Sequence, residues 1–208
     1  SVAVAVVLTW AVRMSPGPLV RIATRMASLG YAVPGAVVAV GVLLPLAWFD
    51  NVLDAWMRDV FDVSTGLLLS GTVVALLFAY LVRFLAISIN AVESSLGRVT
   101  PNMERSARTL GHRPGSVLQL VDAPLMLGSL LAAGLLVFVD VMKELPATLV
   151  LRPFDFNTLA VRTYELAADE RLREAATPGL AIVLAGLLPV IMLSSAIAHS
   201  RPGGRQVD

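Results

Sequence analysis

The sequence predicts an all-α protein, a polytopic bundle of transmembrane helices with about five membrane segments. Hydrophobic residues make up 57% of the 208 residues and charged residues 15%, and the mean hydropathy is +0.79. These values lie outside the usual range of soluble domains. The apolar residues also gather in runs close to the roughly 20 residues that a helix needs to cross the hydrocarbon. The chain holds no cysteine, so it offers no disulfide and no thiolate metal site.

Four apolar runs are predicted to span the membrane: residues 33–49, 66–89, 125–142 and 178–198. A fifth run, residues 2–12, is too short to span alone. It also lacks the basic start and the small-residue cleavage site of a signal peptide. We interpret it as the end of a truncated helix, which makes the chain a fragment of a longer protein. Residues 1–200 then form one transmembrane domain, and residues 201–208 form a cytoplasmic tail.

Three shorter helices are predicted between the spans. Residues 19–29 are amphipathic, with Arg21 and Arg25 four apart on one face, and are expected to lie along the cytoplasmic interface. Residues 51–62 and 158–173 show helical spacing of apolar residues and are expected to be short external helices, the second bounded by Asn157 and Pro178.

The distribution of charge predicts how the chain is oriented in the membrane. The loops on one side carry nine basic and four acidic residues, and those on the other carry six basic and eleven acidic residues. Because basic residues are enriched on the cytoplasmic side, the first set of loops is predicted to be cytoplasmic and the acidic set external.

A polar segment, residues 103–124, separates two of the predicted spans. Thr100 is a plausible cap and Pro101 suits a first helical turn. Met103, Ala107 and Leu110 fall on one face of the predicted helix, and Gly111 is expected to end it. Glu104, Arg105 and Arg108 flank that face. A second short turn, residues 116–121, leads to Pro124. The segment is either a solvated connection or a rigid helix–Gly–helix protrusion that binds a cytoplasmic partner.

The spacing of this segment resembles the signature loop of binding-protein-dependent ABC importer permeases. That loop reads Glu-Ala-Ala, three residues, Gly, nine residues, Ile-x-Leu-Pro. Gly111 and Pro124 match it in type and register, and Ser106 and Ala107 hold the two Ala positions. Arg105 stands at the Glu position, with Glu104 one residue earlier. The resemblance implies that residues 104–111 are the coupling helix, which docks on an ATPase subunit and transmits its closure.

A second set of residues resembles the ferric-iron branch of these permeases. The segments that carry this resemblance are residues 29–35, 140–148, 151–154 and 159–162. Permeases of that branch are typically two fused copies of a six-helix unit of the type I fold. Since this chain has one signature loop, it resembles the C-terminal copy with its first helices missing. The resemblance implies a second permease half, ATPase subunits that bind ATP, and a periplasmic binding protein as partners.

Asp140, Lys143 and Glu144 lie at the end of the predicted span 125–142, within one helical turn of each other. They are either an interfacial cluster that pairs internally or a polar wall of the translocation path near an outer gate. Pro146 is expected to break the helix at that gate. With Thr148, these residues are the predicted translocation path, because charges at membrane depth usually face a partner or a wet cavity.

The remaining polar residues are assigned simpler roles. Arg83, two turns from the end of its span, is expected to extend to the lipid headgroups. His112 and His199 have no second ligand at metal spacing, so no metal site is predicted. The sequence contains no phosphate-binding loop, and no nucleophile–base pair stands out, so neither a cofactor in this chain nor an enzymatic activity is expected.

These observations predict a permease subunit of an ABC importer in the bacterial inner membrane, with ferric iron as the cargo and alternating access as the mechanism. No nucleic acid partner is expected. One alternative is the same fold carrying thiamine, sulfate, molybdate or a polyamine. Another is an ion-coupled secondary transporter or a membrane scaffold. A secondary carrier should place ionisable groups near the bilayer midplane, whereas the cluster here lies at a helix end.

Overall fold

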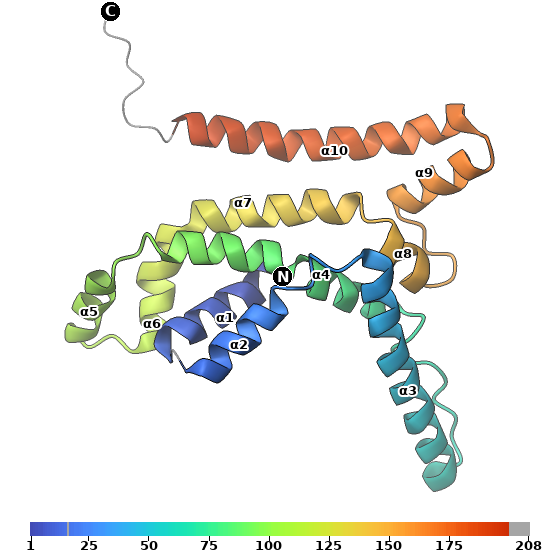
Figure 1. The fold of residues 1–208 in the computed structure, drawn as a ribbon, viewed down its shortest axis with the longest axis horizontal. Helices are drawn as coiled ribbons and strands as arrows, with labels where there is room; N and C mark the ends of the chain where they lie inside the picture. Colours follow the sequence, from blue (N-terminus) through green and yellow to red (C-terminus); the bar gives the residue numbers. More distant parts are fainter. Residues whose placement is uncertain (16, 200–208) are drawn as a thin grey trace, which may run out of the picture.

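The computed structural model describes residues 1–15 and 17–199, and these fold into helices joined by short connections (Figure 1). The predicted tail, residues 201–208, lies outside the described residues. The elements in chain order are α1 (Val2–Met14), α2 (Pro18–Ala27), α3 (Gly35–Phe61), α4 (Val73–Leu96), α5 (Pro101–Thr109), α6 (Pro114–Val117), the π-helical segment η1 (Leu118–Asp122), α7 (Ala123–Met142), α8 (Pro146–Leu151), α9 (Leu159–Ala168) and α10 (Leu172–His199).

Within the described residues, four helical segments are long and apolar enough to cross a membrane: Gly35–Phe61, Val73–Leu96, Pro114–Met142 and Leu172–Met192. The predicted polytopic helical bundle is therefore confirmed. Many large apolar side chains on these segments are exposed, among them Leu44, Leu131 and Leu184. In a bilayer such side chains face lipid or a neighbouring helix, so their exposure is expected for this class of protein.

Helix α4 is the centre of the packing. One half of it packs with α3 and α8 around a buried cluster that includes Val42, Leu76 and Leu151. The other half packs with α1 and α7 around a second cluster that includes Ile89 and Met126. The two clusters share α4, so the elements at both ends of the bundle are held by one helix.

The two ends of the bundle carry different elements (Figure 1). Helices α5 and α6 lie at one end, called here the α5 end, and α8 and α9 lie at the other, the α8 end. Helices α7 and α10 run between these ends, whereas α3 runs across their direction and projects away from them.

The structure corrects three predicted boundaries. Residues 35–61 form one helix, so the span 33–49 and the external helix 51–62 are continuous. The span that was expected to begin at residue 66 begins at Val73, because Gly66 and Gly71 have positive φ angles and lie in a non-helical strap. Helix α10 begins at Leu172, which places Pro178 inside it rather than at its boundary.

The strap, residues 62–72, is fixed to α3 by two aspartates one helical turn apart. Asp50 is fully buried and accepts hydrogen bonds from the backbone N–H groups of Leu69 and Ser70 and from the Ser70 hydroxyl. Asp54 accepts bonds from the backbone N–H groups of Thr65 and Gly66. These two carboxylates therefore bind the chain's own backbone.

Candidate functional site

Helix α5 begins and ends as the sequence predicted. Thr100 is its N-cap residue and Pro101 occupies the first turn, although the Thr100 side chain makes no capping hydrogen bond. At the other end Gly111 has a φ of +88°, a conformation that favours glycine. The N–H of Gly111 bonds to the carbonyl of Arg108, and that of His112 bonds to the carbonyl of Ala107. This bond pattern is a Schellman motif, which gives the turn after α5 a defined shape.

The faces of α5 differ from the predicted ones. Glu104 and Ala107 point inward and are 9% and 8% exposed. Met103 and Leu110 are exposed, Leu110 by 80%, and so are Arg105, Ser106 and Arg108. The predicted face of Met103, Ala107 and Leu110 is therefore divided, because the helix turns Ala107 toward the bundle. The outward surface is a pair of apolar residues with a basic rim.

Arg13, at the end of α1, holds α5 against the bundle. Its Nε lies 2.7 Å from Oε1 of Glu104, an ion pair that lacks hydrogen-bond alignment. Its two terminal nitrogens donate to the carbonyls of Leu96 and Val99, each at 2.6 Å. These carbonyls belong to the end of α4 and the turn after it, so one guanidinium joins α1, α4 and α5. Arg13 was missed by sequence reasoning because nothing in its local pattern signals distant acceptors.

Pro124 lies in the first turn of α7, directly after the π-helical segment. Within that segment the chain makes a wider turn, in which the N–H of Ala123 bonds to the carbonyl of Leu118. Because proline has no N–H and its ring crowds the carbonyl four residues earlier, a wider turn accommodates it without ending the helix. The predicted short turn at 116–121 is thus part of a helix that continues to Met142. Asp122 in this segment is fully buried, and its carboxylate has no hydrogen-bond partner within the described residues.

The predicted cluster at the α8 end separates into two ion pairs. Lys143 lies 2.7 Å from Asp140, and its side chain is 63% exposed. The hydrogen bond to Asp140 raises the pKa of Lys143, with the charge of Asp140 and the nearby Tyr31 adding to the effect. Glu144 points away from this pair and into the bundle. Internal pairing, one of the two alternatives for this cluster, is found for Asp140 and Lys143 and not for Glu144.

Glu144 forms a buried ion pair with Arg83 of α4, with Arg83 Nε and Glu144 Oε2 2.9 Å apart. The two side chains are 17% and 6% exposed. Arg83 also donates to the carbonyl of Val33 at 2.8 Å, and Glu144 accepts from the N–H of Ala147. The prediction that Arg83 extends to the headgroups is therefore wrong: an acceptor inside the bundle satisfies its charge.

Thr148 and Pro146 belong to the structure around this pair. Pro146 opens α8 in its first turn rather than bending a continuous helix. The Thr148 hydroxyl donates to the carbonyl of Glu144 and lies 2.5 Å from the Tyr80 hydroxyl. Thr148 is fully buried.

Two glycines let the backbone approach these polar groups. A Cβ atom at Gly35 would lie 2.5 Å from Oε1 of Glu144 and 3.3 Å from the Arg83 guanidinium. A Cβ atom at Gly30 would lie 2.1 Å from the carbonyl oxygen of Val82. The connection between α2 and α3 therefore packs directly on α4 and on the Arg83–Glu144 pair.

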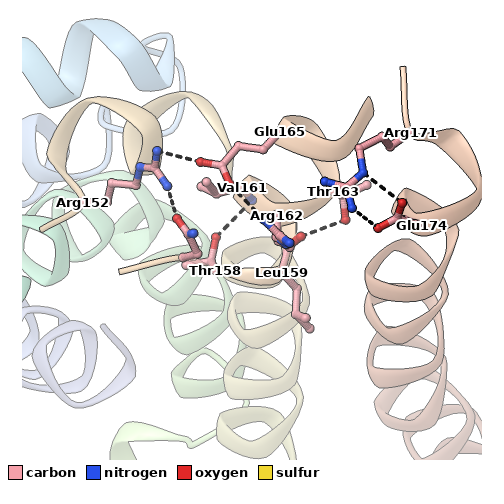
Figure 2. A network of polar contacts seen from close by, with 10 residues as sticks. Arg152, Thr158, Leu159, Val161, Arg162, Thr163, Glu165, Arg171 and Glu174 are labelled. Atoms are coloured by element: carbon pink, nitrogen blue, oxygen red, sulfur yellow. Dashed lines mark hydrogen bonds and ion pairs between the residues drawn. The ribbon is translucent and has the colours of Figure 1, made fainter. Parts of the chain in front are cut away.

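A polar network orders the connections beyond α8 (Figure 2). Arg152 donates to Glu165 of α9 at 2.9 Å and also to Asn157 in the turn between them. Thr158 caps α9 by accepting from the N–H of Val161. Arg171 binds Glu174 at the start of α10. Phe154, in the same turn, is 95% exposed.

The chain is similar to two transport proteins, while no family model matches it. It is 29% identical over 169 residues, 81% of this chain, to the Fe(3+)-transport system permease protein FbpB 2 of Haemophilus influenzae. It is 29% identical over 125 residues, 60% of this chain, to a protein described as the 2-aminoethylphosphonate transport system permease PhnV of Salmonella typhimurium.

The chain covers 30% of the first relative and 46% of the second, less than half of each. Both relatives are permeases, which agrees with the resemblance of the signature loop to that of ABC importer permeases. The first is an Fe(3+)-transport permease, which agrees with the resemblance to the ferric-iron branch. The four described helices that are long and apolar enough to cross a membrane fit the similarity to transport permeases.

Proposed function

We propose that this chain is part of the permease subunit of an ATP-driven ABC importer and that its cargo is ferric iron. The observation that carries the proposal is α5, an ordered helix that ends in a Schellman turn at Gly111 and presents Met103 and Leu110 outward. The similarity over 169 residues to an Fe(3+)-transport permease supports both the class and the cargo.

In this proposal α5 docks on a cytoplasmic ATPase subunit, which binds the ATP. The exposed apolar pair Met103 and Leu110 suits a shallow groove, and Arg105 and Arg108 suit an acidic rim around it. Arg13 joins α5 to α1 and α4, so a pull on α5 reaches both helices. The continuous helix from Pro114 to Met142 carries the same movement to the α8 end.

At the α8 end the proposal places an external binding protein that delivers the cargo. Opening and closing of the bundle against a second permease half would then expose the path to each side in turn. The chain's own part is to bind, guide and release the cargo, with no covalent chemistry on it.

A second cargo is favoured by one observation. The Salmonella relative, whose description names 2-aminoethylphosphonate, has the same 29% identity to this chain as the iron permease, over a shorter stretch. Uptake of ferric iron and of 2-aminoethylphosphonate by the intact transporter, each with its binding protein, decides between the two.

The coupling role is tested by replacing Gly111 with valine. The site has open space, since nothing lies within 4 Å of a Cβ atom there, but its φ of +88° is strained for a branched residue. The strain, on the order of 1–2 kcal/mol, should distort the turn after α5. We expect weaker co-purification of the ATPase subunit and slower iron uptake, with normal membrane insertion.

Gly115→Val is the matched control, because Gly115 also has open space but no positive φ. If the Gly111 variant retains both ATPase binding and uptake at the level of the control, the coupling role is wrong.

A further inference from the structure

A groove runs along α4 between the α2–α3 connection and α7. Its wider part has a volume of about 550 Å³ and is lined by residues that include Ser28, Tyr31, Asn90 and Leu136. A second cavity of about 260 Å³ continues toward the α5 end and is lined by residues that include Arg21, Arg25 and Glu93. Ser28 and Asn90 line both, so the two cavities adjoin.

Asn90 is the most informative residue of this groove. It lies within a 24-residue apolar helix, it is exposed, and among the described residues it has no hydrogen-bond partner. Polar side chains in membrane segments almost always face a partner or a water-filled cavity. Glu93, one turn further along α4, is also exposed and unpaired in the described structure. Both side chains line the groove, so they are positioned to bind a polar ligand there.

Charged residues lie at both ends of the groove. Tyr31 at its α8 end lies near Lys143, whose pKa it helps to raise. At its α5 end Arg21 and Arg25 line the cavity, one turn apart on α2. Neither guanidinium is in an ion pair within the described chain, although Glu93 lines the same cavity. The apolar residues of α2, Leu19, Ile22 and Met26, are exposed on its other side.

We propose that this groove, rather than the surroundings of Glu144 and Thr148, is the cargo's route along this half of the permease, and that it suits cargo presenting oxygen atoms. The inference rests on the proposed transport function. Glu144 and Thr148 are buried and bound to Arg83 and Tyr80, so they leave no space for cargo. The groove instead offers the Asn90 amide and the Ser28 and Tyr31 hydroxyls among apolar residues in its wider part, and at its α5 end it offers two guanidiniums without an ion pair in the described residues. Metal-bound carboxylates and a phosphonate are cargo groups with this chemistry.

Cysteine labelling tests the route directly, because this chain contains no cysteine. Asn90→Cys is made in the full-length permease, with cysteines elsewhere replaced, and assembled with its ATPase and binding protein in membrane vesicles. The membrane-impermeant cation MTSET is the probe. We expect it to modify Asn90→Cys at least about tenfold faster than Leu131→Cys, since a thiol in lipid does not ionise. Leu131 is exposed on α7 but lies outside the groove.

Modification of Asn90→Cys should also block iron uptake, whereas Leu131→Cys should transport normally after treatment. Ser28→Cys is the second variant if Asn90→Cys fails to insert. Protection of these positions from the reagent, or unchanged uptake after modification, overturns the inference. Failure of the proposed function is recognised separately, because untreated wild-type vesicles would then take up no iron.

The preference for oxygen-bearing cargo is tested at the two arginines. The double variant Arg21→Gln/Arg25→Gln should lose most uptake, and lysine at both positions should restore part of it, since lysine keeps the charge but not the fork of donors. Arg98→Gln is the control, because Arg98 is exposed and does not line the cavity. Uptake by the glutamine variant equal to that of the control overturns the preference.

Discussion

At the scale of single residues, the pair Arg83–Glu144 has the largest consequence. Glu144 is buried and Arg83 is partly buried in the bundle, and each charge is compensated by the other. Removing one partner of a buried pair typically costs about 3–5 kcal/mol, because the remaining charge is left without compensation. A residue pair separated by 61 positions therefore decides how α8 is held against α4.

We expect Arg83→Met and Glu144→Leu each to lower the melting temperature of the purified protein in detergent strongly. The double variant Arg83→Met/Glu144→Leu should recover part of the loss, because neither charge is then buried alone. Lys143→Met is the control: the Lys143 side chain is 63% exposed, so its pair with Asp140 should contribute less than the Arg83–Glu144 pair. If the double variant lost as much melting temperature as the two single variants together, the two charges would not compensate each other.

A second prediction concerns Gly35, whose backbone lies close to the Glu144 carboxylate. Gly35→Ala places a Cβ atom 2.5 Å from Oε1 of Glu144, so the ion pair must shift or α3 must move. We expect a lower melting temperature for this variant. Gly41→Ala, on the same helix with nothing within 4 Å, should be neutral or stabilising by up to about 1 kcal/mol. Equal effects of the two substitutions would show that the space around Gly35 is larger than described.

At the scale of elements, α3 and the strap form a unit that is held by carboxylates. Asp50 accepts bonds from two backbone N–H groups and one hydroxyl of the strap, and it is fully buried. Without it these donors would be buried unpaired, which costs about 1–3 kcal/mol for each group.

Asp50→Ala is therefore expected to release the strap, so that a protease added from the outside cleaves within residues 63–72. Asp59→Ala, an exposed aspartate on the same helix, should leave the cleavage rate unchanged. A strap that stays resistant in Asp50→Ala would mean that Asp54 alone holds it.

Sequence reasoning succeeded for features that depend on local pattern. The spans follow from runs of apolar residues, and the end of α5 follows from Gly111, whose positive φ is needed at that point. It failed where the partner lies far along the chain. The acceptors of Arg83 and Arg13 come from other elements, and no local spacing indicates them. The two faces of α5 were assigned incorrectly for the same reason, since burial of Ala107 depends on how α5 packs on the bundle.

At the scale of the whole molecule, α4 joins the clusters of both ends, so its buried residues should govern the stability of the entire bundle. Leu76 is 1% exposed and packs with α3 and α8, whereas its neighbour Leu77 is 58% exposed. Leu76→Ala should destabilise the permease by about 2–5 kcal/mol through the cavity it leaves. Leu77→Ala should cost far less, because its side chain faces outward.

The stabilities of Leu76→Ala and Leu77→Ala are compared by thermal unfolding in the same detergent. A cost at Leu77 as large as that at Leu76 would indicate that the outward face of α4 is covered by another subunit in the assembled transporter.

The wide turn at residues 118–122 also has a consequence for chain length. It inserts one residue into the helix from Pro114 to Met142 while the faces on either side stay in register. A deletion further along would turn every later side chain by about 100° and carry Asp140 and Lys143 to another face. Leu120 is 63% exposed, so its loss removes no buried contact. Removal of Leu120 should therefore be tolerated better than removal of one residue within 123–142, as thermal unfolding of the two deletion variants would show.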